Sequence, residues 1–265
     1  MSYANGPRIV TDGLVCCLDA ANRKSYAGSG SAWNDLSGNN NHATLVASPT
    51  YDTNNKGSIS FNGSTQYAEV TTRNTNLEFQ PTSPYSCFVF LKSPASASQS
   101  AIISNLEGAT PYQGWDFFFN NGSAANTLAV HFKSSWTTNA FKVMINYNFT
   151  TYANQWTMLA YTYDGSCPTN STNSINSVNF YINGQLETSG KTWQVGDGFN
   201  STNETISYDS NQRFRVASRW LSGQINVGSP ISVGNVLLYN NKELSADEVK
   251  QNYDALKGRF GYNEE

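Results

Sequence analysis

The sequence is poor in charge. Asp, Glu, Lys and Arg make up 13% of its 265 residues, whereas roughly 25% is usual in soluble domains. The formal net charge is −3, and no run of basic residues is longer than two. Binding to nucleic acid depends on clustered Lys and Arg side chains that displace counterions from phosphates. The composition therefore argues against a nucleic-acid partner.

Long apolar runs are also missing. No stretch of the chain approaches the roughly 18 apolar residues that a membrane-spanning helix needs, so we expect no membrane partner. Residues 1–8 lack the charged segment followed by an apolar run that marks a secretory signal. We therefore expect the protein to assemble in a cytoplasm.

Cysteines are few and poorly placed for a disulfide framework. They are Cys16, Cys17, Cys87 and Cys167, and no two of them have the C-x-x-C spacing. The adjacent pair does not bridge easily to itself, so we expect four free, buried thiols. A disulfide from Cys17 to Cys87 or Cys167 is the alternative.

Neutral polar residues and aromatics take the place of charge. Aromatics make up 13% of the chain, and they alternate with Asn, Ser and Thr in at least a dozen short segments separated by turn residues. This spacing favours an all-β, two-sheet antiparallel jelly-roll sandwich. Two polar segments, 164–177 and 194–212, are predicted to be loops. Loops of such folds gather at the ends of the sheets, where binding sites usually lie.

The chain closes with a different pattern. After an apolar strand, Ser245 and Glu248 form a capping-box pair. Val249 and Leu256 then recur at helical spacing, and Gly258 is placed to end the helix. The sequence therefore predicts one short C-terminal α-helix that packs against a sheet.

Four sets of segments together carry a family resemblance. They are Gly-Leu-Val-Cys-Cys-Leu-Asp at 13–19 with Trp-Asn-Asp-Leu-Ser-Gly at 33–38, Ser-Ile-Ser-Phe-Asn-Gly at 58–63, the aromatic strand at 156–165 with the hairpin at 178–186, and the closing segment 236–260. In this order they resemble the concanavalin A-like lectin/glucanase superfamily, in its laminin G-like form found in tailed-phage virion proteins. The resemblance implies one jelly-roll domain over residues 1–265, with a short arm at about 1–8. Within the Trp-Asn-Asp-Leu-Ser-Gly motif, we expect Trp33 and Leu36 in the core and Asp35 in a turn.

Catalytic signatures are absent from the predicted strands. Glucanases of the superfamily carry E-x-D-x-x-E on one strand, which places two carboxylates on one face of the sheet, and no such spacing occurs here. His131 alternates with apolar neighbours and is predicted to be a core or surface residue, and no G-x-S-x-G elbow is present. We expect no catalytic residue, although an enzyme that uses loop carboxylates remains an alternative.

Calcium is the one metal that the resemblance implies, because relatives bind it through loop oxygens. Asp164, Asp197 and Asp209 lie in the predicted loops, and together with the Asn-rich loops they would be able to supply such ligands. No loop has EF-hand spacing. The same three residues would be the first to test for a catalytic role.

Three tryptophans lie in polar, loop-like contexts: Trp136, Trp193 and Trp220. A Trp face stacks on the apolar face of a sugar, and an exposed Trp also anchors protein interfaces. These three are our candidates for glycan or interface contacts, with burial in the core as the alternative.

Two functions follow. The favoured one is a non-enzymatic structural protein on the surface of a phage particle, as a head decoration or fibre-like protein in contact with capsid or tail subunits. A homo-oligomer is compatible with this function. The alternative is a carbohydrate-binding module or adhesin that recognises host-surface glycans.

Overall fold

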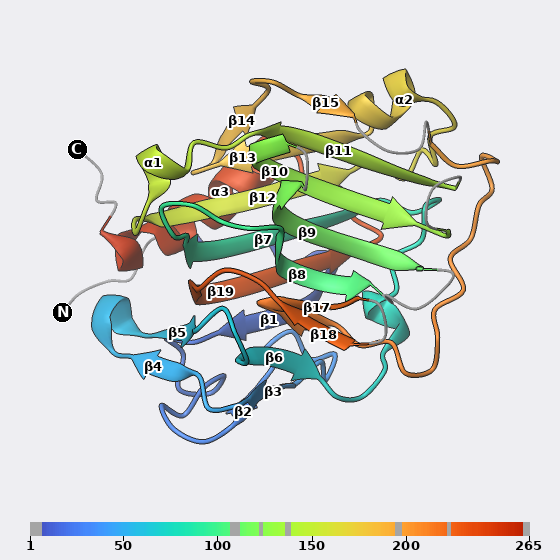
Figure 1. Ribbon diagram of the computed structural model, residues 1–265. Helices are drawn as coiled ribbons and strands as arrows, with labels where there is room; N and C mark the ends of the chain where they lie inside the picture. Colours follow the sequence, from blue (N-terminus) through green and yellow to red (C-terminus); the bar gives the residue numbers. More distant parts are fainter. Residues whose placement is uncertain are drawn as a thin grey trace.

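Two antiparallel sheets pack face to face in the computed structural model (Figure 1). It describes residues 7–106, 112–121, 124–135, 139–193, 198–221 and 224–261, so residues 1–6 of the predicted arm lie outside the described residues. Sheet A has the order β14-β13-β12-β7-β19-β5-β4, with β1 paired to β19. Sheet B has the order β15-β11-β10-β9-β8-β16-β6-β3-β2. The predicted jelly-roll sandwich is confirmed.

The strands of sheet A are β1 (Leu14–Asp19), β4 (Thr50–Asp52), β5 (Ser58–Phe61), β7 (Tyr85–Lys92), β12 (Trp156–Tyr163), β13 (Val178–Ile182), β14 (Gln185–Glu187) and β19 (Ile231–Asn240). Those of sheet B are β2 (Ala32–Trp33), β3 (Ala43–Val46), β6 (Tyr67–Val70), β8 (Ser100–Leu106), β9 (Gly114–Asn121), β10 (Ala124–Lys133), β11 (Ala140–Asn146), β15 (Thr192–Trp193) and β16 (Arg215–Val216). A separate hairpin joins β17 (Ser218–Leu221) to β18 (Gln224–Val227). The helices are α1 (Phe149–Tyr152), α2 (Ser171–Asn176) and α3 (Ala246–Lys257), with 3-10 turns η1 (Asn54–Lys56), η2 (Thr75–Leu77) and η3 (Gly258–Phe260). Among the described residues, no helix has the length and apolar content needed to cross a membrane.

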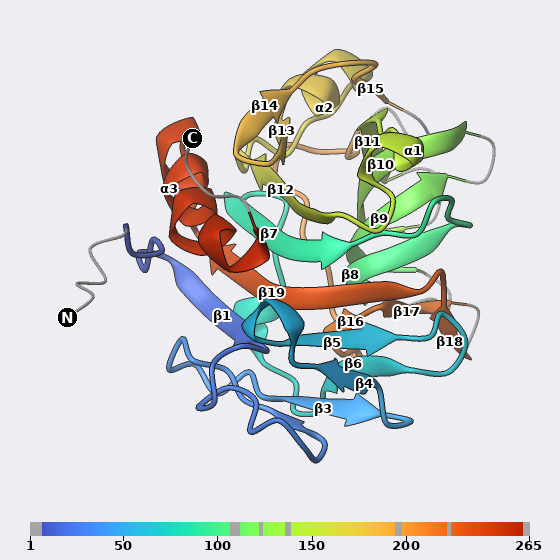
Figure 2. The same cartoon turned by 90° about the vertical axis from the view of Figure 1, so that its left-hand side faces the viewer.

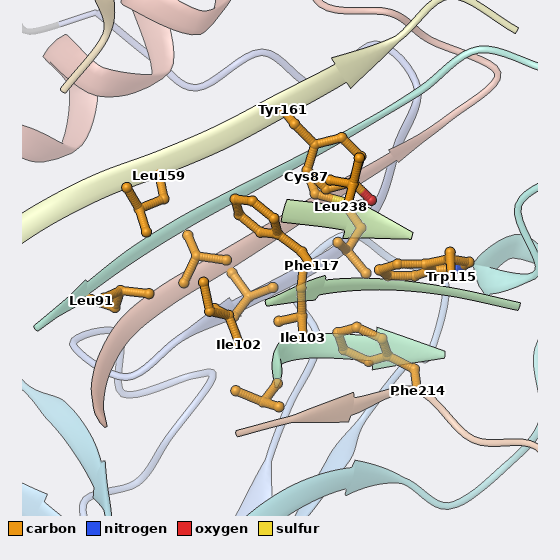
Figure 3. Close-up of a cluster of buried hydrophobic side chains, with 14 of the residues drawn as sticks. Cys87, Leu91, Ile102, Ile103, Trp115, Phe117, Leu159, Tyr161, Phe214 and Leu238 are labelled. Carbon is orange, nitrogen blue, oxygen red and sulfur yellow. Dashed lines mark hydrogen bonds between the residues drawn. The ribbon is translucent and has the colours of Figure 1, made fainter. Parts of the chain in front are cut away.

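The main core lies between the two sheets. Side chains alternate along each strand, so Trp115 and Phe117 of β9 both belong to this core. Phe117 points toward Tyr161 of sheet A, as Figure 3 shows, and their ring centroids are 4.9 Å apart. Cys87 lies in the same layer and its Sγ donates to Tyr161 Oη at 3.2 Å. This alternation, repeated over both sheets, is what the aromatic-polar pattern of the sequence predicts.

All four cysteines are buried and free, as expected. Burial raises the pKa of the Cys17 thiol to about 12 and that of Cys16 well above its ordinary value. Such thiols stay protonated at neutral pH and behave as small apolar side chains.

The Trp-Asn-Asp-Leu-Ser-Gly motif forms a turn around one buried carboxylate. Asp35 Oδ1 accepts from the backbone N–H of Cys17 at 2.7 Å and of Ser37 at 2.9 Å, and Oδ2 accepts from Asn41 N–H at 3.0 Å. Trp33 is fully buried. The predicted roles of Asp35 and Trp33 are confirmed, and the carboxylate ties this turn to β1. Leu36 differs from the prediction: it is only partly buried and packs against the cluster that also contains Val249, not in the main core.

Helix α3 covers the outer face of sheet A (Figure 2). The predicted capping box is present: Ser245 Oγ accepts from Glu248 N–H at 3.2 Å, and Ser245 N–H donates to Glu248 Oε2 at 2.9 Å. Val249 is fully buried against Phe88 and Phe90 of β7. Because α3 covers one face and sheet B the other, β7 is buried on both faces, which explains its nearly continuous apolar sequence.

As predicted, α3 ends at Lys257 and Gly258 is its C-cap, but this glycine does not have the left-handed conformation that is usual there. Gly258 has a right-handed backbone conformation, with φ of −60°, and the chain continues into η3. The left-handed glycine is Gly261, with φ of +86°. The extra turn brings the Phe260 ring to 4.4 Å from the Phe90 ring, so packing against the sheet extends the helical segment.

Truncation of Val249 to alanine is expected to lower the free energy of unfolding by about 2 kcal/mol, because a fully buried side chain leaves a cavity. Leu256→Ala is expected to cost less, since Leu256 is only partly buried. Urea unfolding of both variants measures the difference. Unchanged transitions in both would show that α3 is not docked on sheet A.

Candidate functional site

The two polar segments marked as loops line one surface pocket at the end of the sandwich where β12 finishes. Its volume is about 220 Å³. We call it the loop pocket, and its lining residues are Asp164, Ser166, Cys167, Pro168, Thr169, Asn173, Asn176 and Thr202. Binding sites of such folds usually lie at loops of this kind, and the structure brings residues from both polar segments together.

A tight turn places Asp164 at the pocket. Its Oδ1 accepts from the backbone N–H of Ser166 at 2.8 Å. Gly165, between them, has φ of +76°, and a Cβ there would lie 2.6 Å from Pro84 N. Glycine alone suits this position, because the backbone is left-handed and a neighbouring segment passes too close for a side chain.

The two loops are tied to each other. Phe199 N–H donates to Pro168 O at 2.7 Å, and Cys167 Sγ donates to Ser201 O at 3.2 Å. A Cβ on Gly198 would lie 2.3 Å from Pro168 O, so the backbones are in direct contact there. Cys167 and Pro168 are the buried residues of the lining, and these contacts between the loops fix its shape.

Helix α2 supplies the remaining wall and corrects the expectation of a loop over all of 164–177. Asn170 caps the helix, with its side chain accepting from Asn173 N–H at 2.9 Å. A capped turn of this kind lets a polar segment become helical. The exposed side chains of Asn173 and Asn176 then line the pocket, where their amides both donate and accept hydrogen bonds.

The chemistry of the loop pocket is that of hydroxyl recognition. Asp164 is its one charged lining residue, and the other polar groups are amides and hydroxyls. A carboxylate accepts from ligand hydroxyls, while Asn amides and Ser or Thr hydroxyls do both. A hydroxylated ligand such as a sugar matches this set better than an anion or an apolar group.

Two exposed hydrophobic side chains flank α2. Leu186 on β14 is 53% exposed and Trp193 on β15 is 39% exposed, and among the described residues no other large hydrophobic side chain is exposed. β14 and β15 are edge strands of the two sheets, and in both Figure 1 and Figure 2 they lie with α2 along one edge of the sandwich. We call this pair the rim.

The other candidate tryptophans do not join Trp193. Trp220 lies on β17, half-buried, with the Arg215 guanidinium 5.4 Å from its ring centroid. β17 follows β16, and four strands of sheet B separate β16 from β15. Trp136 lies outside the described residues. Whether any of them contacts a ligand stays a prediction, but Trp193 and Trp220 do not form one platform.

The acidic candidates are likewise dispersed. Asp209 Oδ1 accepts from Asn211 N–H at 2.7 Å and so closes its own turn, and Asp197 lies outside the described residues. In the part of the chain that the structure describes, no three His, Cys, Asp or Glu side chains come close enough to hold a metal ion.

Sheet B contains a buried ionic cluster that the sequence alone did not predict. Asp116 of β9 is fully buried, with Oδ1 3.2 Å from His131 Nδ1 and Oδ2 3.1 Å from Arg219 Nη1. Lys133 and Lys142 are close enough to interact electrostatically with the Asp116 carboxylate. The one signal in the sequence is an aspartate inside the run Trp-Asp-Phe-Phe-Phe.

The charged groups of the cluster change one another's pKa values. Burial raises the pKa of Asp116, but His131, Arg219 and Lys133 outweigh it and lower that pKa to about 2. Burial and the Lys133 ammonium lower the pKa of His131 to about 3. At neutral pH the imidazole is therefore neutral and Arg219 faces the Asp116 carboxylate. Because Arg219 lies on β17, this buried ion pair joins the β17–β18 hairpin to sheet B.

Solved structures of known proteins are similar to this fold. No family model matches the sequence, and no curated protein matches it. The binding domain of botulinum neurotoxin serotype C1 is similar in structure, with a TM-score of 0.64 and 13% identity over 93% of this chain and 52% of that one. The binding domain of Paraclostridial Mosquitocidal Protein 1 has a TM-score of 0.61 and 16% identity, over 92% and 52%.

The chain shares the fold of these domains. A third example is the binding domain of botulinum neurotoxin DC in complex with rat synaptotagmin II, with a TM-score of 0.62 and 13% identity over 93% and 52%. This chain spans about half the length of the structures that it matches. At such low identity the likeness shows the fold alone, and the virion resemblance stays a prediction.

Proposed function

We propose that this chain is a non-catalytic recognition module that binds a glycan at the loop pocket. The observation that carries the proposal is the pocket itself: two loops tied by backbone contacts, together with α2, hold one carboxylate, two amides and three hydroxyl groups around buried Cys167 and Pro168. Pockets with a few fixed polar groups determine specificity through hydrogen bonds. A pre-formed pocket also reduces the entropy lost on binding.

Similar solved domains support recognition as the role. Their titles describe binding domains, and one botulinum neurotoxin DC binding domain is in complex with SialylT, at 14% identity to this chain. Most glycoside hydrolysis needs two carboxyl groups about 5–9.5 Å apart across the scissile bond, whereas Asp164 is the one carboxylate that lines the loop pocket. Glu243, whose pKa is raised by burial and by Asp164, bonds to Thr162 and does not line it.

We further infer that the module stands on the surface of a phage particle, where the rim contacts a capsid or tail subunit. The family resemblance of the opening and closing segments supports this setting. Leu186 and Trp193 add a specific feature, because exposed aromatic and aliphatic side chains anchor protein interfaces. Both functions are compatible, since a virion surface protein is able to bind glycans through a separate pocket.

A glycan array tests the pocket with matched variants. Asp164→Asn and Asp209→Asn each keep an oxygen to close the local turn and remove one exposed loop charge. We expect Asp164→Asn to lose binding about tenfold or more, as a hydrogen bond to a charged group is worth about 1.5–3 kcal/mol. Asp209→Asn is expected to bind as wild type does.

Three outcomes would contradict the proposal: no glycan bound by the wild type, equal binding by both variants, or release of reducing ends that stops in Asp164→Asn. The virion setting is tested separately, by mass spectrometry of purified particles and by attachment of Trp193→Ala. Absence of the chain from particles would refute that setting and leave glycan binding untouched.

A further inference from the structure

A second pocket lies on the outer face of sheet A, at the opposite end of β7 and β12 from the loop pocket. Its volume is about 210 Å³. We call it the lysine pocket, and its lining residues are Ser60, Phe61, Lys92, Ser93, Pro94, Asn154, Pro230, Ile231 and Ser232. Trp156, which pairs with Lys92, begins β12, and Asp164 follows its last residue. At about 3.3 Å per residue, the two pockets lie on the order of 25 Å apart.

Strand register places the polar residues of the lysine pocket in one row. Ser232 of β19 lies opposite both Ser60 of β5 and Lys92 of β7, and Lys92 lies opposite Trp156. Their neighbours Ile59, Leu91 and Val233 point into the core. Because side chains alternate, the row faces outward.

Lys92 gives the lysine pocket a single positive charge. It is the one charged residue in the lining, and the described residues include no carboxylate paired with it. Its ammonium lies 5.1 Å from the centroid of the Trp156 ring, a cation–π contact that limits where the charge sits. The loop pocket, in contrast, contains a carboxylate and no cation.

Two serine hydroxyls in this row are hydrogen-bonded to each other. Ser60 Oγ and Ser232 Oγ are 2.7 Å apart. One of these hydroxyls donates to the other, so the proton of the accepting serine is available to a ligand. Pro94 and Pro230 also line the pocket and supply an apolar wall.

We propose that the lysine pocket binds the carboxylate-bearing ring of an acidic sugar. The Lys92 ammonium forms an ion pair with the ligand carboxylate, and a serine hydroxyl donates a hydrogen bond to that carboxylate. The apolar face of the sugar ring packs against the proline wall. A bare phosphate or sulfate has no apolar face and would leave that wall without a partner. The pocket is smaller than the roughly 300–1,000 Å³ of drug-sized sites, which limits the ligand to about one ring. This second site goes beyond the proposed function at the loop pocket and does not depend on it.

The Trp156 indole N–H is a reporter beside Lys92, and its partner is Asn55 Oδ1 at 2.9 Å. NMR titration of the wild type with D-glucuronic acid is expected to shift this indole resonance. D-Glucose, which lacks the carboxylate, and inorganic phosphate, which lacks the ring, are expected to bind at least tenfold more weakly. Equal binding of glucose, or of phosphate, to that of glucuronic acid would overturn the proposal.

Variants separate the lysine pocket from general charge effects. Lys92→Met keeps the aliphatic chain over Trp156 and is expected to weaken glucuronic acid binding at least tenfold, and Ser232→Ala severalfold. Lys24→Met removes an exposed lysine that lines neither pocket and is expected to bind as wild type does. Unchanged binding in Lys92→Met would refute the site, and if that variant folds poorly, unchanged binding in Ser232→Ala would do so instead. Asp164→Asn is expected to leave the Trp156 shift intact, so failure here is distinct from failure at the loop pocket.

Discussion

Replacing Asp116 with asparagine will lower the free energy of unfolding by about 3–5 kcal/mol, because the change leaves the buried Arg219 guanidinium without a counter-charge. Asp116 is fully buried and Arg219 nearly so, so water does not replace the lost partner. Urea unfolding at pH 7 measures the loss. The same substitution in an exposed pair, Asp254→Asn opposite Lys250, is expected to cost less than about 1 kcal/mol.

The double variant Asp116→Asn with Arg219→Met makes this test specific. If the two residues act as a pair, the double variant is expected to lose less stability than the sum of the single changes. Additive losses, or an Asp116→Asn effect no larger than that of Asp254→Asn, would show that the pair does not hold the β17–β18 hairpin on sheet B.

Acid is expected to destabilise the protein through His131. In the folded state its pKa is lowered to about 3, whereas an exposed histidine titrates near 6.5. Between these two values the unfolded chain binds the additional proton, so stability falls as the pH falls. The contribution of one such group approaches about 1.4 kcal/mol per pH unit and is fully retained above pH 6.5.

The comparison with His131→Gln isolates this group, since glutamine does not titrate. Stability of both proteins measured by urea unfolding at pH 7, 5.5 and 4.5 is expected to fall more steeply for the wild type. Parallel curves would show that His131 is able to accept a proton in the folded state, through an opening of the cluster that the structure does not show.

Local signals in the sequence were enough to predict several features of the structure. The capping box of Ser245 and Glu248 formed as predicted, because its partners lie three residues apart and need no tertiary contact. Asp35 closes its predicted turn, since most of its partners are also near in the chain. The alternation of aromatic and polar residues predicted the two-sheet sandwich for the same reason. Within each strand, neighbouring residues already indicate which face is buried.

Contacts between distant strands could not be predicted in this way. Asp116 and His131 meet only because β9 and β10 pair in one register, and Arg219 reaches them from a strand about 100 residues later in the chain. A shift of one residue in that register would place the aspartate on the opposite face of the sheet. The sequence shows an aspartate in an aromatic run, but not its partners.

The order of amino acids by itself determined the class of fold, the closing helix with its cap, the turn at Asp35, and the polar character of the segments 164–177 and 194–212. Tertiary structure alone decided that Asp164 and Thr202 line one pocket, that Lys92 stands in a row with Ser60 and Ser232, and that Trp193 and Trp220 are separated. The physical reason is the range of the interactions. Propensity, capping and alternation act within a few residues, whereas a binding pocket forms from side chains that strand order and loop packing bring together from distant positions.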